Sequence, residues 1–210
     1  EWIWQRDPKF WNRCSPLLFP IVGNCRDNRT VIEGTEYHLE KHGFCRDVDF
    51  SVTDRTDTGA TFSIRDSEET KAVYPYSFCL SLTYSLTDGV LSMEYRVDNR
   101  DRRPIWYCLG AHPGFNCPAE EGFSFEDYAL EFEEEETASS MVYDLENLQF
   151  DPSRRLPLLD GSQELRLTRE LFKDDALYFD NLKSRKVSLV NTHTGRGVEV
   201  AFPGFETVAF

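Results

Sequence analysis

The chain has 210 residues and a formal net charge of −14, with 23 Lys and Arg against 37 Asp and Glu. Nucleic acids and anionic membrane surfaces are bound through clustered basic side chains, so this charge disfavours both kinds of partner. Hydrophobic residues at 40% and aromatic residues at 14% exclude a disordered chain and are typical of a folded domain. No apolar run reaches the roughly 18 residues that a bilayer-spanning helix needs.

Alternation of apolar and polar residues, the pattern of a half-buried strand, recurs along the chain. The clearest case is a hairpin in which residues 78–86 and 90–97 flank an Asp88-Gly89 turn. The other predicted strands cover residues 61–64, 105–109, 128–134, 165–167, 187–190 and 198–202. Helical periodicity is hard to find, and residues 168–172 predict a single turn at most. We therefore expect one all-β, antiparallel domain over residues 1–210, a sandwich or a barrel.

The acidity of the chain is uneven. No Lys or Arg occurs between Pro104 and Ser153, a stretch with twelve acidic residues. A calcium site or an acidic tail is one interpretation. However, apolar residues at 128, 130 and 132 alternate with acidic or small ones, which favours a half-buried strand whose residues 131–136 form a solvated edge.

The six cysteines include no Cys-x-x-Cys pair, and their spacing fits neither a zinc knuckle nor a small disulfide scaffold. Most have apolar neighbours, as expected for reduced cysteines that pack as small hydrophobes. This pattern predicts a reducing, cytoplasmic location. We expect neither a metal nor a cofactor.

Two of the four histidines lie beside glycines. His42 precedes Gly43, and His112 stands next to Pro113 in a Gly-Ala-His-Pro-Gly sequence. Glycine lets the backbone approach a ligand closely, and a following proline restricts a residue to extended geometry. An imidazole held in this way can transfer a proton near neutral pH. The alternative, a histidine hydrogen-bonded in a turn or in the core, stays open on these residues alone.

Five motifs follow one another between residues 16 and 116. They are Pro16-Leu17-Leu18-Phe19-Pro20-Ile21-Val22-Gly23, Tyr37-x4-His42-Gly43-Phe44-x-Arg46-Asp47-x2-Phe50, Asp66-Ser67-x2-Thr70, Tyr74-Pro75-Tyr76-x-Phe78 and Gly110-Ala111-His112-Pro113-Gly114-Phe115-Asn116. Together they resemble the aldose 1-epimerase (galactose mutarotase) family, most of all its branch of bacterial proteins named after LacX. The resemblance extends over residues 16–205. It implies the galactose mutarotase-like (supersandwich) fold, a large antiparallel β-sandwich.

The resemblance also implies an isomerase that interconverts the α and β anomers of a hexose by acid–base ring opening. It makes His112 the general acid and places His42 near the ring oxygen. Asp175 matches the aspartate that holds sugar hydroxyls, with the adjacent Asp174 as the alternative.

The family has an arginine in its sugar pocket shortly after the position of Gly23. The register is open here, because both Arg26 and Arg29 follow at short distance. We assign Arg26 to the sugar pocket, with Arg46 as the second candidate. A surface position is an equal alternative for either side chain.

The family's catalytic base is a glutamate in a Cys-x-Glu-Pro-like strand, which follows a segment resembling Phe202-Pro203-Gly204-Phe205. The printed sequence ends at Phe210, and Glu206 lies too early to match. We therefore expect the base beyond Phe210 and a domain truncated at both ends. Loss of such a base lowers a rate by about 10²–10⁴-fold.

Three other functions are compatible with parts of the sequence. A zinc site at His38 and His42 is disfavoured, because the His-Glu-x2-His order is missing and the two would lie ~13 Å apart on a strand. A glycosidase needs a pair of carboxylates, and no pair stands out. The third rival is a non-catalytic carbohydrate-binding or regulatory protein with a mutarotase-like pocket. A phosphorylated hexose would need a basic cluster, and we expect Arg100, Arg102 and Arg103 to be solvated on a turn.

Overall fold

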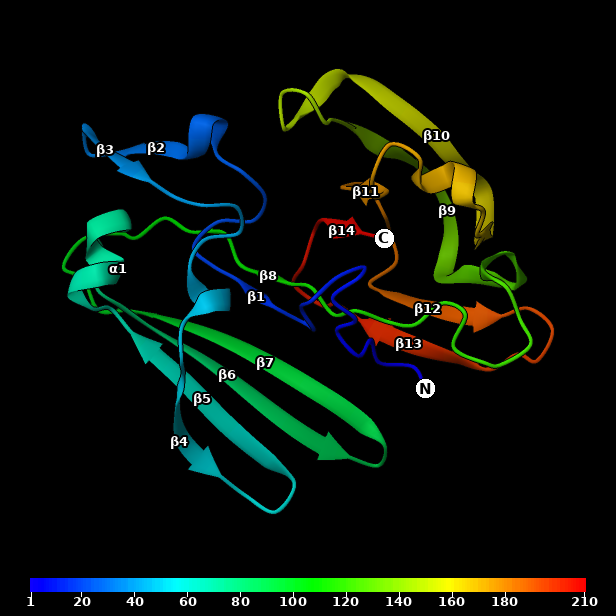
Figure 1. Ribbon diagram of the computed structural model, residues 1–210, viewed down its shortest axis with the longest axis horizontal. Coiled ribbons are helices and arrows are strands. Elements are labelled where there is room, and N and C mark those ends of the chain that lie inside the picture. Colours follow the sequence, from blue (N-terminus) through cyan, green and yellow to red (C-terminus); the bar gives the residue numbers. More distant parts are fainter. The chain divides into compact units, whose positions relative to one another are not determined.

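A computed structural model describes residues 1–210, apart from the side chain of Pro152. The chain divides into two compact units, called here unit 1 (Glu1–Ser15 and Pro113–Phe210) and unit 2 (Pro16–His112). Both consist mainly of antiparallel strands with very little helix, which confirms the all-β prediction (Figure 1). The prediction of a single domain stays a prediction. Among the described residues, no helix is long and apolar enough to cross a membrane.

Unit 2 contains eight strands in three small sheets. Its elements are β1 (Leu17–Leu18), η1 (Arg26–Asn28), β2 (Arg29–Ile32), β3 (Thr35–His38), η2 (Cys45–Asp47), β4 (Ser51–Arg55), β5 (Gly59–Arg65), α1 (Glu68–Val73), β6 (Phe78–Thr87), β7 (Val90–Asn99) and β8 (Gly110–Ala111). The sheets have the orders β1-β8, β2-β3 and β4-β5-β6-β7. The β2–β3 hairpin lies beside α1 (Figure 1).

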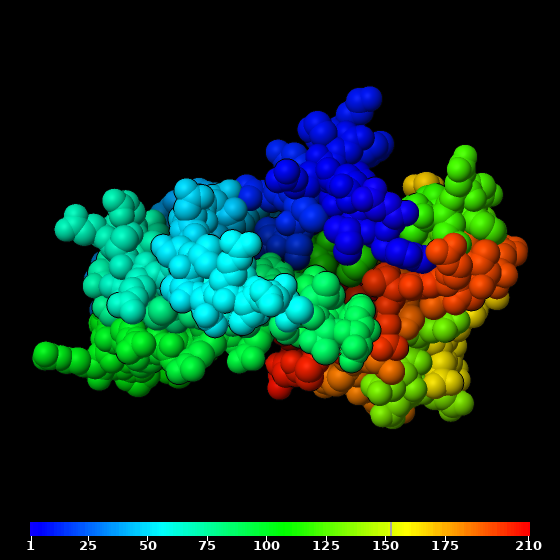
Figure 2. Space-filling model, turned by 90° about the horizontal axis from the view of Figure 1, so that it is seen from below, coloured from blue at the N-terminus to red at the C-terminus, as the bar shows by residue number. Residues whose placement is uncertain are grey.

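The β6–β7 hairpin confirms the clearest sequence prediction. Its ladder runs from Phe78↔Asn99 to Thr87↔Val90. Asp88 and Gly89 have φ angles of 51° and 80°, the left-handed conformation that a two-residue hairpin turn requires. At the other edge of this sheet, β4 is exposed along its whole length and lies open on the face seen in Figure 2, where it is cyan.

The core of unit 2 is an aromatic cluster on the inner face of this sheet. Phe19 and Phe78 are completely buried, with ring centroids 5.1 Å apart. Tyr74 is 5.8 Å from Phe19 and is also buried. Aromatic pairs in such tilted and edge-on arrangements stabilise a core beyond the burial of their area. This cluster holds Phe19 in place. Phe19 directly follows β1, which pairs with β8 next to His112, and its own backbone forms a bridge to Gly43 next to His42.

Two features of unit 2 differ from the sequence predictions. The predicted strand at residues 105–109 is wrong, because the hydrogen bonds of this segment go elsewhere. The carbonyl of Trp106 accepts a hydrogen bond from the Tyr74 hydroxyl (3.0 Å), and the Cys108 N–H donates to the Pro20 carbonyl (2.8 Å). The unpredicted helix α1 starts with a capping box, in which Ser67 Oγ accepts from the Thr70 N–H.

Unit 1 is built on one six-stranded sheet. Its elements are η3 (Phe125–Asp127), β9 (Tyr128–Asp144), β10 (Gln149–Arg166), η4 (Arg169–Phe172), β11 (Tyr178–Phe179), β12 (Lys186–Asn191), β13 (Gly197–Ala201) and β14 (Val208–Ala209). The order is β13-β12-β9-β11-β14, and β10 also pairs with β9. The predicted strands near residues 128, 187 and 198 are confirmed, and the predicted turn at 168–172 is the 3-10 turn η4.

Residues 128–136, which include the predicted acidic edge, form the first half of β9, as predicted. Leu130 and Phe132 are buried and Glu131 is exposed. Glu136 corrects the prediction of a fully solvated edge, because this carboxylate is completely buried. It accepts hydrogen bonds from the backbone N–H groups of Ser184 (2.7 Å) and Lys183 (3.0 Å). Burial alone would raise the pKa of Glu136, but these hydrogen bonds hold it below its ordinary value.

Candidate functional site

The two histidines singled out in the sequence lie together in unit 2. The ring centroids of His42 and His112 are 6.1 Å apart, and the rings are nearly perpendicular at 85°. The segment that ends in Phe19 brings them together. On one side, β1 pairs antiparallel with β8, with Leu17 opposite Ala111. On the other side, Phe19 forms a parallel bridge to Gly43.

Gly43 is required by this close approach. Its φ angle is +70°, and a Cβ atom added to it would lie 2.2 Å from the carbonyl oxygen of Phe19. That carbonyl also accepts a hydrogen bond from the Phe44 N–H (3.1 Å). A side chain at position 43 would therefore separate the chain segments that carry the two histidines.

A reciprocal pair of hydrogen bonds holds His42. Its backbone N–H donates to the Gly23 carbonyl (2.8 Å), and the Gly23 N–H donates to Nδ1 of the His42 ring (3.0 Å). Because a backbone N–H can only donate, Nδ1 must accept and carries no proton. The neutral ring then has its proton on Nε2. His42 is thus held as a hydrogen-bond donor through Nε2–H.

The surroundings of His112 shift the pKa of its imidazole. Although its side chain reaches solvent, the surrounding protein desolvates the imidazole and lowers its pKa below the ordinary 6.5. The positive charge of Lys41 lowers this pKa further. Two imidazolium rings at this separation would repel each other. Protonation of His42 at Nδ1 would break its hydrogen bond with the Gly23 N–H.

The two candidate arginines belong to segments adjoining His42. Arg26 is exposed and begins η1, three residues after Gly23. Arg46 lies in η2, with only 19% of its side chain exposed, and its Nε is 3.4 Å from Asp47 Oδ2. Their assignment to a sugar pocket stays a prediction.

Asp175 belongs to unit 1. Its φ angle of 92° is unusual for a residue other than glycine, and its Oδ2 accepts a hydrogen bond from the Tyr178 hydroxyl (3.1 Å). Tyr178 packs against Phe150 and Tyr143, with ring centroids 4.9 and 5.8 Å away. Burial and the nearby Asp175 carboxylate raise the pKa of Tyr178, so its hydroxyl remains a donor. The sugar-binding role of Asp175 stays a prediction.

The sequence did not identify Gly23 and Lys41 as parts of the site. Gly23 belongs to one of the motifs above. Its contribution, however, is a backbone N–H that sets the tautomer of the His42 ring, and residue types do not predict such a contact. Lys41 precedes His42 directly, yet its effect is on His112, 71 positions along the chain. The hydrogen bond of Gly23 and the charge effect of Lys41 do not follow from sequence spacing, because both depend on how the chain folds.

A metal centre is not formed by the described residues, since no group of three or more His, Cys, Asp or Glu side chains is placed to hold an ion. His38 instead contacts Glu40, with 2.8 Å between Nε2 and Oε1. All six cysteines of the described chain are free thiols.

Comparison with known proteins supports the fold and the family. The sequence profile of the family described as Aldose 1-epimerase matches residues 1–209. The chain is 36% identical to Protein LacX, plasmid, of Lactococcus lactis subsp. lactis over 211 residues, which is 98% of this chain and 71% of that protein. The chromosomal Protein LacX of the same organism has the same identity and coverage.

Two solved structures have the same architecture. A galactose mutarotase related enzyme from Lactobacillus acidophilus superposes with a TM-score of 0.91 at 33% identity, covering 100% of this chain and 69% of that one. A galactose mutarotase-like protein from Lactobacillus casei superposes with a TM-score of 0.89 at 30% identity, covering 100% of this chain and 71% of that one. The predicted galactose mutarotase-like fold is therefore confirmed, and the chain belongs to the aldose 1-epimerase family.

Proposed function

We propose that this protein interconverts the α and β anomers of a hexose by acid–base opening of the sugar ring. The observation that carries the proposal is the pair of adjoining histidines, in one of which Nδ1 accepts a hydrogen bond from the Gly23 N–H. Ring opening needs groups of different protonation around the anomeric centre. His42 supplies a fixed neutral donor, and His112 supplies an exchangeable proton beside it.

In the proposed reaction, the His112 imidazolium gives its proton to the ring oxygen as the bond between that oxygen and C1 breaks. A base removes the proton of the anomeric hydroxyl, so that C1 becomes an aldehyde carbon. Rotation about the C1–C2 bond and closure on the other face produce the second anomer, and the protons return. Nε2–H of His42 donates a hydrogen bond that holds the ring oxygen toward His112. The resemblance gives the role of base to a glutamate in a Cys-x-Glu-Pro-like strand.

Substrate binding is assigned on the same resemblance. Asp175 accepts hydrogen bonds from sugar hydroxyls, and Arg26, or Arg46 as the second candidate, contributes a guanidinium to the pocket. The hydrogen bond from Tyr178 supports the role of Asp175, because it orients one carboxylate oxygen and leaves the other for a ligand. The free cysteines support a reducing, cytoplasmic setting.

Polarimetry of freshly dissolved α-galactose and α-glucose tests the proposal. The protein should accelerate the approach to anomeric equilibrium beyond the buffer rate, and His112→Ala should lower this acceleration by about 10²–10⁴-fold. His38→Asn is the matched control, because this exposed histidine of β3 should not affect the rate.

A small carboxylate such as acetate provides a second readout. Acetate can act as an external base toward the anomeric hydroxyl, so it should increase the protein-dependent rate, and His112→Ala should abolish that increase. Sugar binding without acceleration at any acetate concentration would instead favour the alternative function, a non-catalytic carbohydrate-binding protein.

A further inference from the structure

A pocket lies in unit 2, and the residues that line it do not include the two site histidines. Its volume is about 340 Å³, within the roughly 300–1,000 Å³ of small-molecule sites. It is lined by Pro20, Ile21, Thr30, Val31, Ile32, Glu33, Leu39, Tyr74, Tyr76 and Trp106. Trp106 is the most exposed of the large aromatic residues of this unit, at 77%. The Trp106 indole is therefore presented to solvent at the edge of the pocket.

Polar contacts hold the walls of this pocket in place. The Arg103 guanidinium lies over the Tyr76 ring, 4.8 Å from its centroid, and its Nη2 donates to the Pro75 carbonyl (2.6 Å). Its Nη1 pairs with Glu33 on the β2–β3 hairpin. This corrects the expectation that Arg103 is simply solvated.

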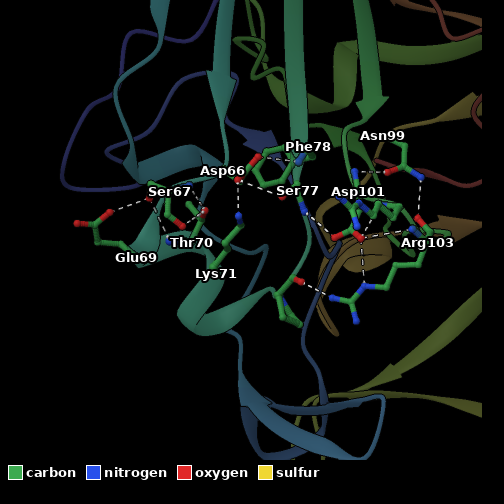
Figure 3. A network of polar contacts seen from close by, with 12 residues as sticks. Asp66, Ser67, Glu69, Thr70, Lys71, Ser77, Phe78, Asn99, Asp101 and Arg103 are labelled. Carbon is green, nitrogen blue, oxygen red and sulfur yellow. Dashed lines mark hydrogen bonds and ion pairs between the residues drawn. The ribbon is translucent and has the colours of Figure 1, made fainter.

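Asp101 connects Arg103 to Ser77, which directly precedes β6, as Figure 3 shows. Its carboxylate accepts from the Ser77 N–H (3.1 Å) and lies 3.4 Å from Arg103 Nε. On the far side of the network, Asp66 accepts from the Phe78 N–H (2.9 Å) and pairs with Lys71 of α1 (2.8 Å). The pocket is therefore bounded by anchored segments, which lowers the entropy cost of binding a ligand.

The position of Trp106 is fixed in the same way. The Tyr74 hydroxyl donates to its carbonyl oxygen (3.0 Å), and two residues later the Cys108 N–H donates to Pro20 (2.8 Å). The backbone at Trp106 and just after it is thus held against Tyr74 and Pro20, which are buried, while the indole stays exposed.

The residues that line the pocket indicate which class of ligand it can bind. The indole of Trp106 and the apolar side chains offer a flat surface for the C–H face of a saturated ring. The Glu33 carboxylate and the hydroxyls of Thr30 and Tyr76 can bind hydroxyl groups at its rim. None of the described lining residues is basic, and the nearby Arg103 guanidinium is already paired with Glu33 and Asp101, so a phosphorylated ligand is disfavoured.

We propose that this pocket, centred on Trp106, is a second saccharide site that binds one neutral pyranose ring by stacking. It is separate in its residues from the histidine pair and does not depend on catalysis. A ring with one apolar face and peripheral hydroxyls satisfies both kinds of lining group at once. A purely apolar ring would use the apolar surface alone and make no hydrogen bond with the polar groups at the rim.

Titration of the ¹⁵N-labelled protein with methyl β-galactoside and methyl β-glucoside tests this site. These glycosides have no free anomeric hydroxyl, so binding is measured without turnover. The indole N–H signal of Trp106, one of four tryptophans, is identified by its loss in Trp106→Phe. We expect a saturable shift of this signal at concentrations up to roughly 100 mM, which covers millimolar dissociation constants.

Trp106→Ala and Thr30→Val are the test variants and Phe10→Ala is the control, and binding to Trp106→Ala is followed through the backbone N–H signals of the β2–β3 hairpin. Trp106→Ala should weaken this binding by at least about tenfold, and Thr30→Val should weaken it less. Phe10→Ala removes another exposed aromatic, at 81%, and should leave the binding unchanged. Anomer exchange should be unaffected by Trp106→Ala, so the failure of either proposal is visible separately.

Three results would overturn the second site. They are the absence of a Trp106 shift with every glycoside, full retention of binding in Trp106→Ala, and binding of cyclohexanol as tight as that of the glycosides. The last result would identify a merely apolar crevice. Binding of glucose 6-phosphate more tightly than methyl glucoside would contradict the neutral ligand class.

Discussion

Substitution of Gly43 by alanine is expected to damage both the stability of unit 2 and the histidine pair. The new Cβ would lie 2.2 Å from the Phe19 carbonyl oxygen and 2.7 Å from Cδ of Pro20. To restore an ordinary contact of 3.4 Å, the carbonyl would have to move by about 1.2 Å. Phe19 is completely buried among aromatic rings, so the chain has little room for such a shift.

The cost has two parts that a second variant separates. The φ angle of +70° by itself disfavours alanine by about 1–2 kcal/mol. Gly89 has a similar φ of +80°, but no described atom lies within 4 Å of a Cβ added there. Gly89→Ala should therefore show the backbone cost alone. Gly43→Ala should cost at least about 2 kcal/mol more, because it also displaces buried backbone.

Urea unfolding of the two variants measures the difference directly. Anomer exchange should also fall in Gly43→Ala, measured under conditions in which the variant is folded, because the bridge at Phe19 sets the distance between the histidines. In Gly89→Ala the exchange rate should be unchanged. Equal losses of stability in both variants would refute the close approach at Phe19.

Three further changes have defined outcomes. Lys41→Gln removes a charge that lowers the pKa of His112, so the decline of exchange with rising pH, followed by polarimetry, should move to higher pH. Glu136→Gln should cost about 2 kcal/mol in thermal or urea unfolding at neutral pH. Because the pKa of Glu136 is lowered by folding, its contribution is present above the unfolded value of 4.5, and the difference between the two proteins should shrink as the pH falls below that value. Tyr178→Phe frees the Asp175 carboxylate, which should raise KM by about 2–10-fold with little change in kcat or stability.

Strands with strict alternation could be predicted from the sequence. The β6–β7 hairpin combines alternation with an Asp-Gly turn, so its register follows from local rules. Residues 105–109 also resemble a strand in composition. Their backbone groups bond instead to a tyrosine hydroxyl and to an isolated carbonyl, contacts that no local pattern encodes.

The site was predictable only in part for the same reason. His42 and His112 are 70 positions apart, and their residue types suggested proton transfer. The different roles proposed for them rest on the Gly23 N–H and on desolvation of His112 by the surrounding protein, which are properties of the folded chain. Likewise, no sequence pattern predicts that Glu136 is buried or that Arg103 anchors a pocket wall, because both side chains are paired across long sequence distances.

A double-mutant cycle on His42 and His112 tests most directly whether these histidines form one acid–base site. The rates of anomer exchange for His42→Ala, His112→Ala and the double variant are measured by two-dimensional exchange NMR on equilibrated galactose. If His42 acts by holding the ring oxygen toward His112, the double variant should be no slower than His112→Ala alone. Losses that multiply in the double variant, or single variants as fast as His38→Asn, would contradict the proposed site.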